Sequence, residues 1–444
     1  MRIAILGTRG IPARYGGFET FAEELSTRLV SRGHRVTVYC RERPRQPLWR
    51  GVDLRYLPAL HSKYLETLQH TFCSTIDLAT HQYDVALYCN AANAIFTPLA
   101  RMAGTPVALN VDGLERRRKK WNVFARCWYM MSEALATFCP DEIVTDAERI
   151  RDYYKQRYGR SSWFIPYGAP IGPVQDSTTL QDLNLERRRY FLYVSRFEPE
   201  NNPLMVRSAF EKVATEFRLA LVGDAPYAVD YIRAVRNTSD PRIVIPGAIY
   251  GDGYHELQSN SFAYIHATEV GGTHPALIEA MGRGALVLYL WTEENHEVAG
   301  GAGLPFRNER ELIDQMRAAL AMSEEERQKL RAAAVQRVRE RYSWDAVTTT
   351  YERLFESLVR GGQTTCVVGQ AFSLRGASAP QGSPKRPAEA GLQTEGLPHH
   401  APATFIPTGG PHQRRKLTPS DHSGQQFILS PRSSILPCPL TAGQ

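Results

Sequence analysis

Residues 3–29 read IAILGTRGIPARYGGFETFAEELSTRL, and this stretch decides the fold class. Its first four residues are apolar and are typical of a buried strand. A glycine-rich loop follows and leads into a helical pattern. The apolar residues on one face of this expected helix are Phe18, Phe21, Ala22, Leu25 and Leu29. A strand, a loop and a helix in this order predict the first half of a parallel β–α–β unit.

The same alternation continues along the chain. Short apolar runs alternate with helical patterns, pause in a segment rich in Pro and Gly between residues 166 and 173, and then restart. We therefore predict an α/β protein with two facing Rossmann-like, doubly wound domains. Ligands are expected outside the carboxyl ends of the strands, in a cleft between the domains. The predicted strands are residues 3–6, 36–40, 85–88, 107–111, 143–145 and 163–165, then 191–194, 219–222, 243–245, 262–265 and 286–288.

Changes in composition and in the periodicity of apolar residues predict the domain boundaries. We expect an N-terminal domain at residues 1–168, a linker at 169–189, a C-terminal domain at 190–342 and a closing helix at 343–360. Residues 361–444 are dense in Pro, Gly and Ser and have no sustained period. Such a segment buries too little apolar surface to offset the entropy of ordering, so we expect a disordered tail.

Composition excludes several classes of protein. The net charge of +7 includes +4 from residues 361–444, so the remaining 360 residues carry only +3, which does not suggest a nucleic-acid-binding protein. The seven cysteines show no metal-ligand spacing, and a reducing compartment is expected. The sequence shows no signal peptide and no run of about 18 apolar residues. We therefore expect a cytoplasmic protein.

The first loop contains Gly7, Gly10, Gly16 and Gly17. Its spacing differs from the G-x-G-x-x-G fingerprint, and no acidic residue ends the second predicted strand, which disfavours a nicotinamide cofactor. Two interpretations remain open. Exposed amides at the start of the helix favour an anion such as phosphate, or the glycines only turn the chain.

A second loop precedes a helix in the C-terminal domain, in HATEVGGTHPALIEAMGRG (residues 266–284). Gly271, Gly272 and Thr273 form the expected turn, and Pro275 suits the first helical turn. The helix amides, the Thr273 hydroxyl and His274 are expected to face a diphosphate. Glu279 is expected to accept hydrogen bonds from sugar hydroxyls, or to be an ordinary solvated helix residue.

Arg196 follows a predicted strand, where its guanidinium can clamp phosphate oxygens. Asn201 and Asn202 precede a helix that Pro203 can open. One of them is therefore expected to be the N-cap, which is an alternative to a role of Asn201 in donor binding.

Asp112 stands directly after the predicted strand at 107–111 and is expected to face the same cleft. A carboxylate there can contact an acceptor hydroxyl or stabilise developing positive charge; the alternative is a loop or cap residue. The basic run from Arg116 to Lys120 is followed by aromatic residues, which suits an anionic bilayer surface. The alternative is a solvated helix face.

Together these segments resemble the retaining family-four glycosyltransferases of the GT-B fold, and most closely a bacterial subgroup of rhamnosyltransferases for cell-surface polysaccharides. The resemblance extends from residue 1 to about residue 347. The motifs that carry it are GTRGIPARYGGFETFAEEL (7–25), KYLETL (63–68), NVDGLERRRKKW (110–121), SRFEPENN (195–202) and EVGGTHPALIEAM (269–281).

The resemblance implies transfer of a sugar from a nucleotide diphosphate donor to a hydroxyl, with retained configuration and with no metal or cofactor. It implies L-rhamnose from dTDP-rhamnose as the donor sugar and a lipid-linked saccharide as the acceptor at the inner face of the cytoplasmic membrane. The donor would lie mainly on the C-terminal domain and the acceptor on the N-terminal one. Gly16 and Gly17 would line the donor phosphates, Arg196 would bind the diphosphate, and Glu279 would hold the nucleotide ribose.

The sequence departs from the broad family at two positions and from the subgroup at a third. Gly271 stands where the first of two glutamates is usual, Asn201 replaces a lysine, and His274 stands where the subgroup usually has asparagine. Two alternatives therefore remain: the same fold with a UDP- or GDP-sugar donor, and a non-catalytic partner of a polysaccharide assembly complex. Asp112 is our candidate acceptor-side carboxylate, followed by Glu19 and Glu269.

Overall fold

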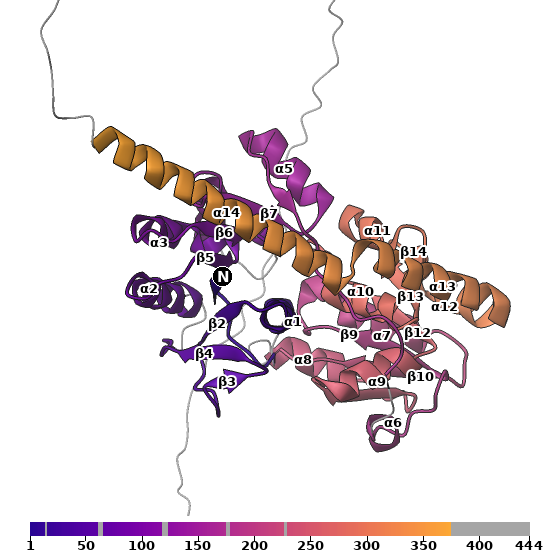
Figure 1. Ribbon diagram of the computed structural model, residues 1–444. Coiled ribbons are helices and arrows are strands. Elements are labelled where there is room, and N and C mark those ends of the chain that lie inside the picture. Colours follow the sequence, from indigo (N-terminus) through magenta and orange to yellow (C-terminus); the bar gives the residue numbers. More distant parts are fainter. Residues whose placement is uncertain (14–15, 61–64, 118–122, 175–177, 226–228, 374–444) are drawn as a thin grey trace, which may run out of the picture. The chain divides into compact units, whose positions relative to one another are not determined.

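The side chains of β1 (Arg2–Leu6) alternate between two hydrophobic cores. Ile3 and Ile5 pack in one core, whereas Ala4 and Leu6 pack in the other, and all four are fully buried. A strand buried on both faces lies in the interior of a sheet covered by helices on both sides. The computed structural model (Figure 1) describes residues 1–13, 16–60, 65–117, 123–174, 178–225 and 229–373, which belong to one compact unit.

The N-terminal lobe is built on an 8-stranded sheet of order β3-β4-β2-β1-β5-β6-β7-β8. The paired strands are parallel except β3 and β4, which form an antiparallel pair at one edge. Besides β1 its strands are β2 (Arg35–Cys40), β3 (Leu48–Trp49), β4 (Val52–Tyr56), β5 (Val85–Cys89), β6 (Val107–Asn110), β7 (Glu142–Thr145) and β8 (Trp163–Phe164).

Helices cover both faces of this sheet. Phe21 and Leu25 of α1 pack on the Ile3 face, while Leu78 of α2 and Tyr154 of α5 pack on the Leu6 face. The helical segments of the lobe are α1 (Gly17–Ser31), α2 (Glu66–Ala79), α3 (Thr97–Met102), α4 (Val123–Ala136) and α5 (Glu148–Tyr158), with 3-10 turns η1 (Ala91–Phe96) and η2 (Glu115–Arg117).

The C-terminal lobe repeats this design with a 6-stranded parallel sheet of order β11-β10-β9-β12-β13-β14. Along β9, Phe191 and Tyr193 face one core and Tyr190 and Leu192 face the other. The strands are β9 (Tyr190–Val194), β10 (Arg218–Val222), β11 (Ile243–Gly247), β12 (Ala263–His266), β13 (Leu286–Leu290) and β14 (Leu304–Phe306).

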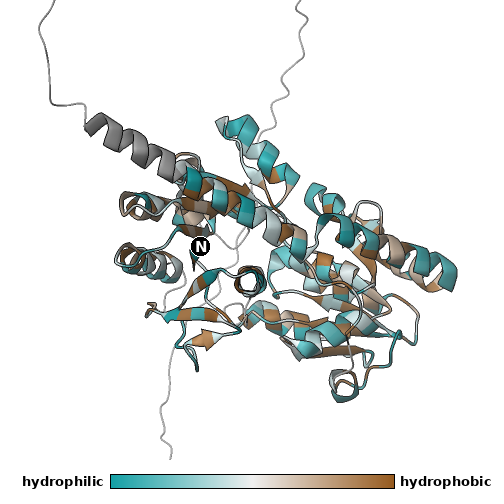
Figure 2. Ribbon diagram, in the orientation of Figure 1, coloured by the Kyte–Doolittle hydropathy of each residue, from teal (hydrophilic) through white to brown (hydrophobic). Residues whose placement is uncertain are grey.

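The helices of the C-terminal lobe surround this sheet, and hydrophilic residues dominate the visible face of α13 (Figure 2). No helix among the described residues is long and apolar enough to span a membrane. The helical segments are α6 (Thr179–Asp182), η3 (Pro199–Asn201), α7 (Pro203–Glu211), α8 (Val229–Arg236), α9 (Asp252–Asn260), α10 (Pro275–Gly282), α11 (Glu293–Ala299), α12 (Glu309–Ala321) and α13 (Glu324–Arg341).

The last helix, α14 (Trp344–Ser373), returns to the N-terminal lobe (Figure 1). Its Tyr351 packs against Phe21 of α1, with ring centroids 5.5 Å apart. Trp344 packs so closely on the chain between the lobes that a Cβ on Gly168 would lie 2.3 Å from its ring. The polypeptide therefore crosses between the lobes twice at one place, which gives a hinge made of two adjacent segments.

The predicted fold class is confirmed, and every predicted strand is present. Strands β3, β4 and β14 were not predicted, because β3 and β14 have only two and three residues and β4 has a single buried residue, Val52, so none of them gives a sustained apolar run. The short helix α6 was also not predicted. Helix α14 extends beyond residue 360, where we placed the start of the tail, and residues 374–444 lie outside the described part of the chain.

Candidate active site

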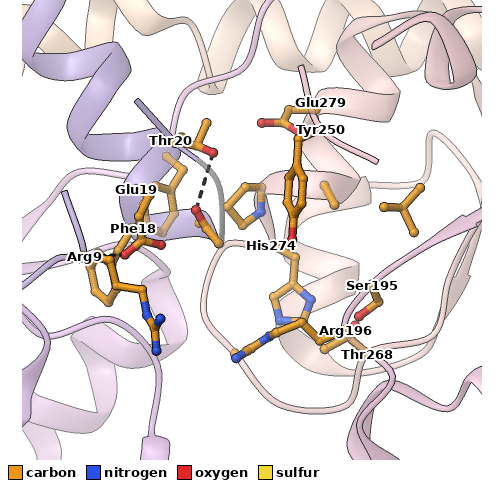
Figure 3. Close-up of a pocket in the computed structure, with 18 of the residues that line it drawn as sticks. Arg9, Phe18, Glu19, Thr20, Ser195, Arg196, Tyr250, Thr268, His274 and Glu279 are labelled. Atoms are coloured by element: carbon orange, nitrogen blue, oxygen red, sulfur yellow. Dashed lines mark hydrogen bonds between the residues drawn. The ribbon is translucent and has the colours of Figure 1, made fainter. Parts of the chain in front are cut away.

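Loops from the carboxyl ends of strands in both sheets line one cavity of about 690 Å3. The first glycine loop and the Gly271–Pro275 segment meet there: a Cβ on Gly17 would lie 3.2 Å from Cγ of Pro275. Figure 3 shows side chains of the two lobes facing each other across this space. All site residues predicted from sequence line it: Asp112, Gly16, Gly17, Arg196, Asn201, Gly271, Gly272, Thr273, His274 and Glu279.

The first loop uses its four glycines in different ways. Gly7 and Gly10 have φ angles of +88° and +108°, and a Cβ on Gly7 would lie 2.4 Å from a backbone oxygen. These two glycines are therefore required by the turn itself. Gly16 is extended and forms the N-cap of α1, and Gly17 begins the helix. The turn interpretation thus applies to Gly7 and Gly10, whereas phosphate binding at Gly16 and Gly17 stays a prediction.

Glu19 holds the loop against the first turn of α1. Its Oε1 accepts a hydrogen bond from the Arg9 backbone N–H at 2.9 Å. Burial raises the pKa of Glu19, while this backbone bond and the charge of Arg41 act in the opposite direction. Glu19 therefore holds the loop through this hydrogen bond and also lines the cavity.

Arg196 lies on the loop after β9, and its side chain is about one-third exposed. Two hydrogen bonds to the Arg196 carbonyl hold the loop, one from the Asn201 side-chain Nδ2 and one from the Glu198 backbone N–H, both at 2.7 Å. Asn201 thus shapes the arginine loop, and Asn202 occupies the N-cap position of α7. Figure 3 shows the Arg196 side chain extending toward the N-terminal lobe.

The turn before α10 is in direct contact with the N-terminal lobe. The Thr273 N–H donates to Asp146 Oδ2 at 2.7 Å, and the Thr273 hydroxyl donates to the Asp146 backbone carbonyl. A Cβ on Gly272 would lie 2.2 Å from Asp146 Oδ1, so only glycine fits beside this carboxyl group. Burial, and then the charge of Asp112, raise the pKa of Asp146.

Glu279 is not a solvated helix residue. It is buried in α10, and its Oε2 accepts a hydrogen bond from the Tyr254 hydroxyl at 2.6 Å. Burial is the main cause that raises the pKa of Glu279 to about 7; the Tyr254 hydrogen bond lowers it and the nearby Glu24 raises it. The carboxyl group therefore changes charge near neutral pH, at the wall of the cavity.

Asp112 lies two residues beyond Asn110, the last residue of β6, with a φ angle of +57°, and its N–H donates to Asn110 Oδ1 at 3.1 Å. It lines the cavity, as do Glu19 and Asn90 of the same lobe. Residues 118–120 of the basic run lie outside the described residues. Arg116, at its start, pairs with the buried Glu133 at 2.9 Å, so this arginine is part of the lobe's packing.

Arg9, Arg41 and Tyr254 are among the cavity residues that sequence reasoning missed. Arg9 lines the cavity from the N-terminal lobe and pairs with Glu66 at 3.1 Å. Arg41 lines it too, and Tyr254 supplies the hydroxyl that orients Glu279. The sequence offered a signal for two of these residues: Arg9 lies within the glycine loop itself, and Arg41 comes directly after the predicted strand at residues 36–40. Tyr254 has no such signal, because its helix lies far from any motif.

The described residues contain no group of three or more His, Cys, Asp or Glu side chains arranged to hold a metal ion. The groups available for chemistry in the cavity include three guanidinium groups (Arg9, Arg41 and Arg196), backbone amides, imidazoles and carboxyl groups. This set can bind an anion and position hydroxyl groups.

Two family models match the chain. Residues 15–169 match Glycosyltransferase Family 4, and residues 201–353 match a model described as glycosyl transferase-like. A search of curated protein sequences found no match.

Solved structures with the same fold share little sequence identity with the chain. Sucrose-phosphate synthase from Thermosynechococcus elongatus is 19% identical with a TM-score of 0.68, over 81% of this chain and 99% of that one. HepE from Anabaena, in complex with UDP, is 15% identical with a TM-score of 0.65, over 80% and 100%. The UDP-forming α,α-trehalose-phosphate synthase from Burkholderia vietnamiensis is 13% identical with a TM-score of 0.62, over 80% and 100%. The chain is therefore a glycosyltransferase of the GT-B fold, with a family-four domain in its N-terminal half.

Proposed function

We propose that this protein transfers L-rhamnose from dTDP-rhamnose to a hydroxyl group of a lipid-linked saccharide in surface polysaccharide synthesis, with retained configuration and without a metal ion. One observation carries the proposal: Arg196, the start of α1 and the start of α10 line a single cavity between the lobes. A guanidinium and helix amides are the groups that bind a diphosphate in the absence of a cation. The sugar identity comes from the motif resemblance.

The leaving diphosphate is the charge that this site has to stabilise. Arg196 on one lobe and Arg9 on the other place permanent positive charge at the cavity. Preorganised donors of this kind typically stabilise a transition state by several kcal/mol. In this structure a carboxylate oxygen of Asp146 accepts from the Thr273 amide, so a phosphate oxygen bound at this amide would take its place.

Glu279 is suited to hold the sugar hydroxyls of the nucleotide. Its Tyr254 contact fixes one carboxylate oxygen, and the carboxyl group lies at the cavity wall. Asp112 is our candidate for the acceptor-side carboxylate, because it lines the same cavity from the N-terminal lobe. Gly16 and Gly17 are assigned to the donor phosphates.

A second proposal concerns location: the protein binds the inner face of the cytoplasmic membrane through an apolar surface of the N-terminal lobe. Helices α2, α3 and α4 lie around η1, and Phe72 of α2 packs on Phe96 with ring centroids 5.8 Å apart. The exposed positions of these three helices include two arginines and no acidic residue, which suits an anionic bilayer. They are Phe72, Ile76, Ala79, Leu99, Arg101, Met102, Val123, Phe124, Arg126, Cys127, Met130 and Met131.

The first prediction concerns the donor. dTDP at 100 times its dissociation constant stabilises the protein by about 2.7 kcal/mol and raises its melting temperature by several degrees. Arg196→Ala removes the shift, whereas Arg189→Ala, on the surface of the same lobe and outside the cavity, keeps it. A thermal shift with UDP or GDP but not with dTDP overturns the rhamnose assignment.

Turnover separates an enzyme from a nucleotide-binding partner. We expect dTDP to be released from dTDP-rhamnose in the presence of a saccharide acceptor, at the same rate with and without a chelator. Nucleotide binding without release from any sugar donor would instead support a non-catalytic member of a polysaccharide assembly complex.

The second prediction concerns pH. Since Glu279 binds nucleotide hydroxyls as a carboxylate and its pKa is about 7, dTDP affinity falls about tenfold between pH 8 and pH 6 through this group. Glu279→Gln removes the contribution of Glu279 to the pH dependence of dTDP affinity and leaves only the contribution of the phosphate groups of dTDP. Titration calorimetry of both proteins at the two pH values measures the difference. Identical pH profiles would remove Glu279 from the nucleotide site.

The third prediction concerns the apolar surface. The protein is expected to float with vesicles of phosphatidylglycerol and phosphatidylcholine, less so at high salt. Replacing Phe124 and Met130 together with serine lowers the bound fraction at least fivefold. Val229→Ser, which changes an equally exposed apolar residue of the C-terminal lobe, has no effect. Equal binding of all three proteins would contradict the assignment of this surface.

A further inference from the structure

The C-terminal lobe contains a second cavity, of about 490 Å3. Arg188, Phe217 and Phe262, which precede β9, β10 and β12, line it, so it lies at the amino ends of these parallel strands. The cavity between the lobes lies at their carboxyl ends, where His266, the last residue of β12, lines it. A volume of 490 Å3 is in the range of small-molecule sites, so the second cavity has room for a ligand of its own.

Two guanidinium groups are held side by side at the second cavity. Arg188 Nη1 donates to the Ser261 carbonyl at 2.8 Å, and Arg331 Nη2 donates to the next carbonyl along the chain, that of Phe262, at 3.1 Å. Partial desolvation, and then the charge of Arg331, lower the pKa of Arg188. Both groups still keep their charge at neutral pH, so two like charges lie close together in a partly desolvated place.

One carboxyl group offsets part of this positive charge. Glu324 pairs with Arg327 and with Arg331, both at 2.9 Å. Three arginines and one glutamate line the second cavity, which gives it a net charge of +2. A guanidinium has five N–H donors, and among the described residues the Arg188 guanidinium bonds only to the Ser261 carbonyl. Charge and donors therefore remain for an anion.

The backbone at Arg188 has a conformation that favours glycine. Its φ angle is +59°, where a side chain is sterically unfavourable. The Arg188 N–H donates to the Asn260 carbonyl at 2.8 Å, which holds this segment against the start of β12. An arginine in this conformation costs stability, and residues under such strain cluster at ligand-binding sites.

We propose that the second cavity binds a small organic phosphate whose phosphate group bridges Arg188 and Arg331. Arginine suits this contact, because its planar pairs of donors match phosphate oxygens. The organic part is expected to lie against the aromatic wall, where the rings of Phe217 and Phe262 pack with centroids 4.9 Å apart. The inference is independent of the proposed transfer reaction, because none of these four residues lines the cavity between the lobes.

The first test uses phenyl phosphate and inorganic phosphate as probes. Titration calorimetry is done with full-length Arg196→Ala protein, which weakens anion binding between the lobes. Phenyl phosphate is expected to bind more tightly than inorganic phosphate, and Arg188→Gly lowers both affinities at least tenfold because charged donors are lost. Arg50→Gly changes another arginine with a positive φ angle, outside the second cavity, and is expected to have no effect. Equal affinities for the two probes, or unchanged binding in Arg188→Gly, would overturn the proposal.

A second variant has the opposite expected effect. Glu324 shares Arg331 with the proposed phosphate and repels it, so Glu324→Gln is expected to tighten phenyl phosphate binding at least threefold. Glu325→Gln alters the net charge of the protein equally, but Glu325 pairs with Lys329 and does not line the second cavity. This control is expected to leave the affinity unchanged. Equal effects of the two substitutions would show general electrostatic attraction and no specific site.

Two further measurements exclude other roles of Arg188. In phosphate-free buffer, Arg188→Gly is expected to melt within about 2 °C of wild type, because relief of the positive φ angle offsets the lost Ser261 hydrogen bond. A much lower melting temperature would make the guanidinium a structural group. Flotation with vesicles that contain phosphatidic acid is expected to be the same for Arg188→Gly and wild type. Loss of flotation would assign the arginines to a lipid headgroup, and either result would overturn the proposal.

Discussion

The approach of Gly17 to Pro275 is the contact on which the site depends. It joins the first turn of α1 to the first turn of α10, two segments that belong to different sheets and lie more than 250 residues apart in sequence. A second close approach, with a Cβ on Gly113 only 2.7 Å from the Gly271 backbone, supports the same geometry. At both contacts a glycine of the N-terminal lobe lies against the segment that precedes and begins α10: Gly113 has no room for a side chain, and Gly17 packs against the Pro275 ring, at the place where a diphosphate would lie.

Several carboxyl groups at and beside the cavity are buried, and burial opposes their ionisation. Burial raises the pKa values of Glu19 and Glu279, which line the cavity, and of Asp146, which lies against the Gly272–Thr273 turn. Each of these carboxyl groups accepts a hydrogen bond from its surroundings. Opposite them stand guanidinium groups that keep their charge at all relevant pH values. Such a site can bind an anion at the arginines and hydroxyl groups at the carboxylates, which is the division that the proposed nucleotide-sugar donor requires.

Much of this site could be predicted from sequence because its residues follow strands. Arg196, Asp112 and the two glycine segments each come directly after a predicted strand, and the carboxyl ends of parallel strands share an edge. What escaped prediction are contacts across long sequence distances. Thr273 is held by Asp146 of the other lobe, and a tyrosine of α9 orients Glu279. No local sequence pattern indicates which distant side chain will contact a given turn.

A structure of the protein with dTDP bound tests the account most directly. We expect the two phosphate groups between Arg196 and the first turns of α1 and α10, with Arg196 nitrogens about 2.7–3.2 Å from phosphate oxygens. The deoxyribose ring of the nucleotide should then lie against Glu279. Phosphate groups outside the cavity between the lobes, or bound with no contact to Arg196, would contradict it.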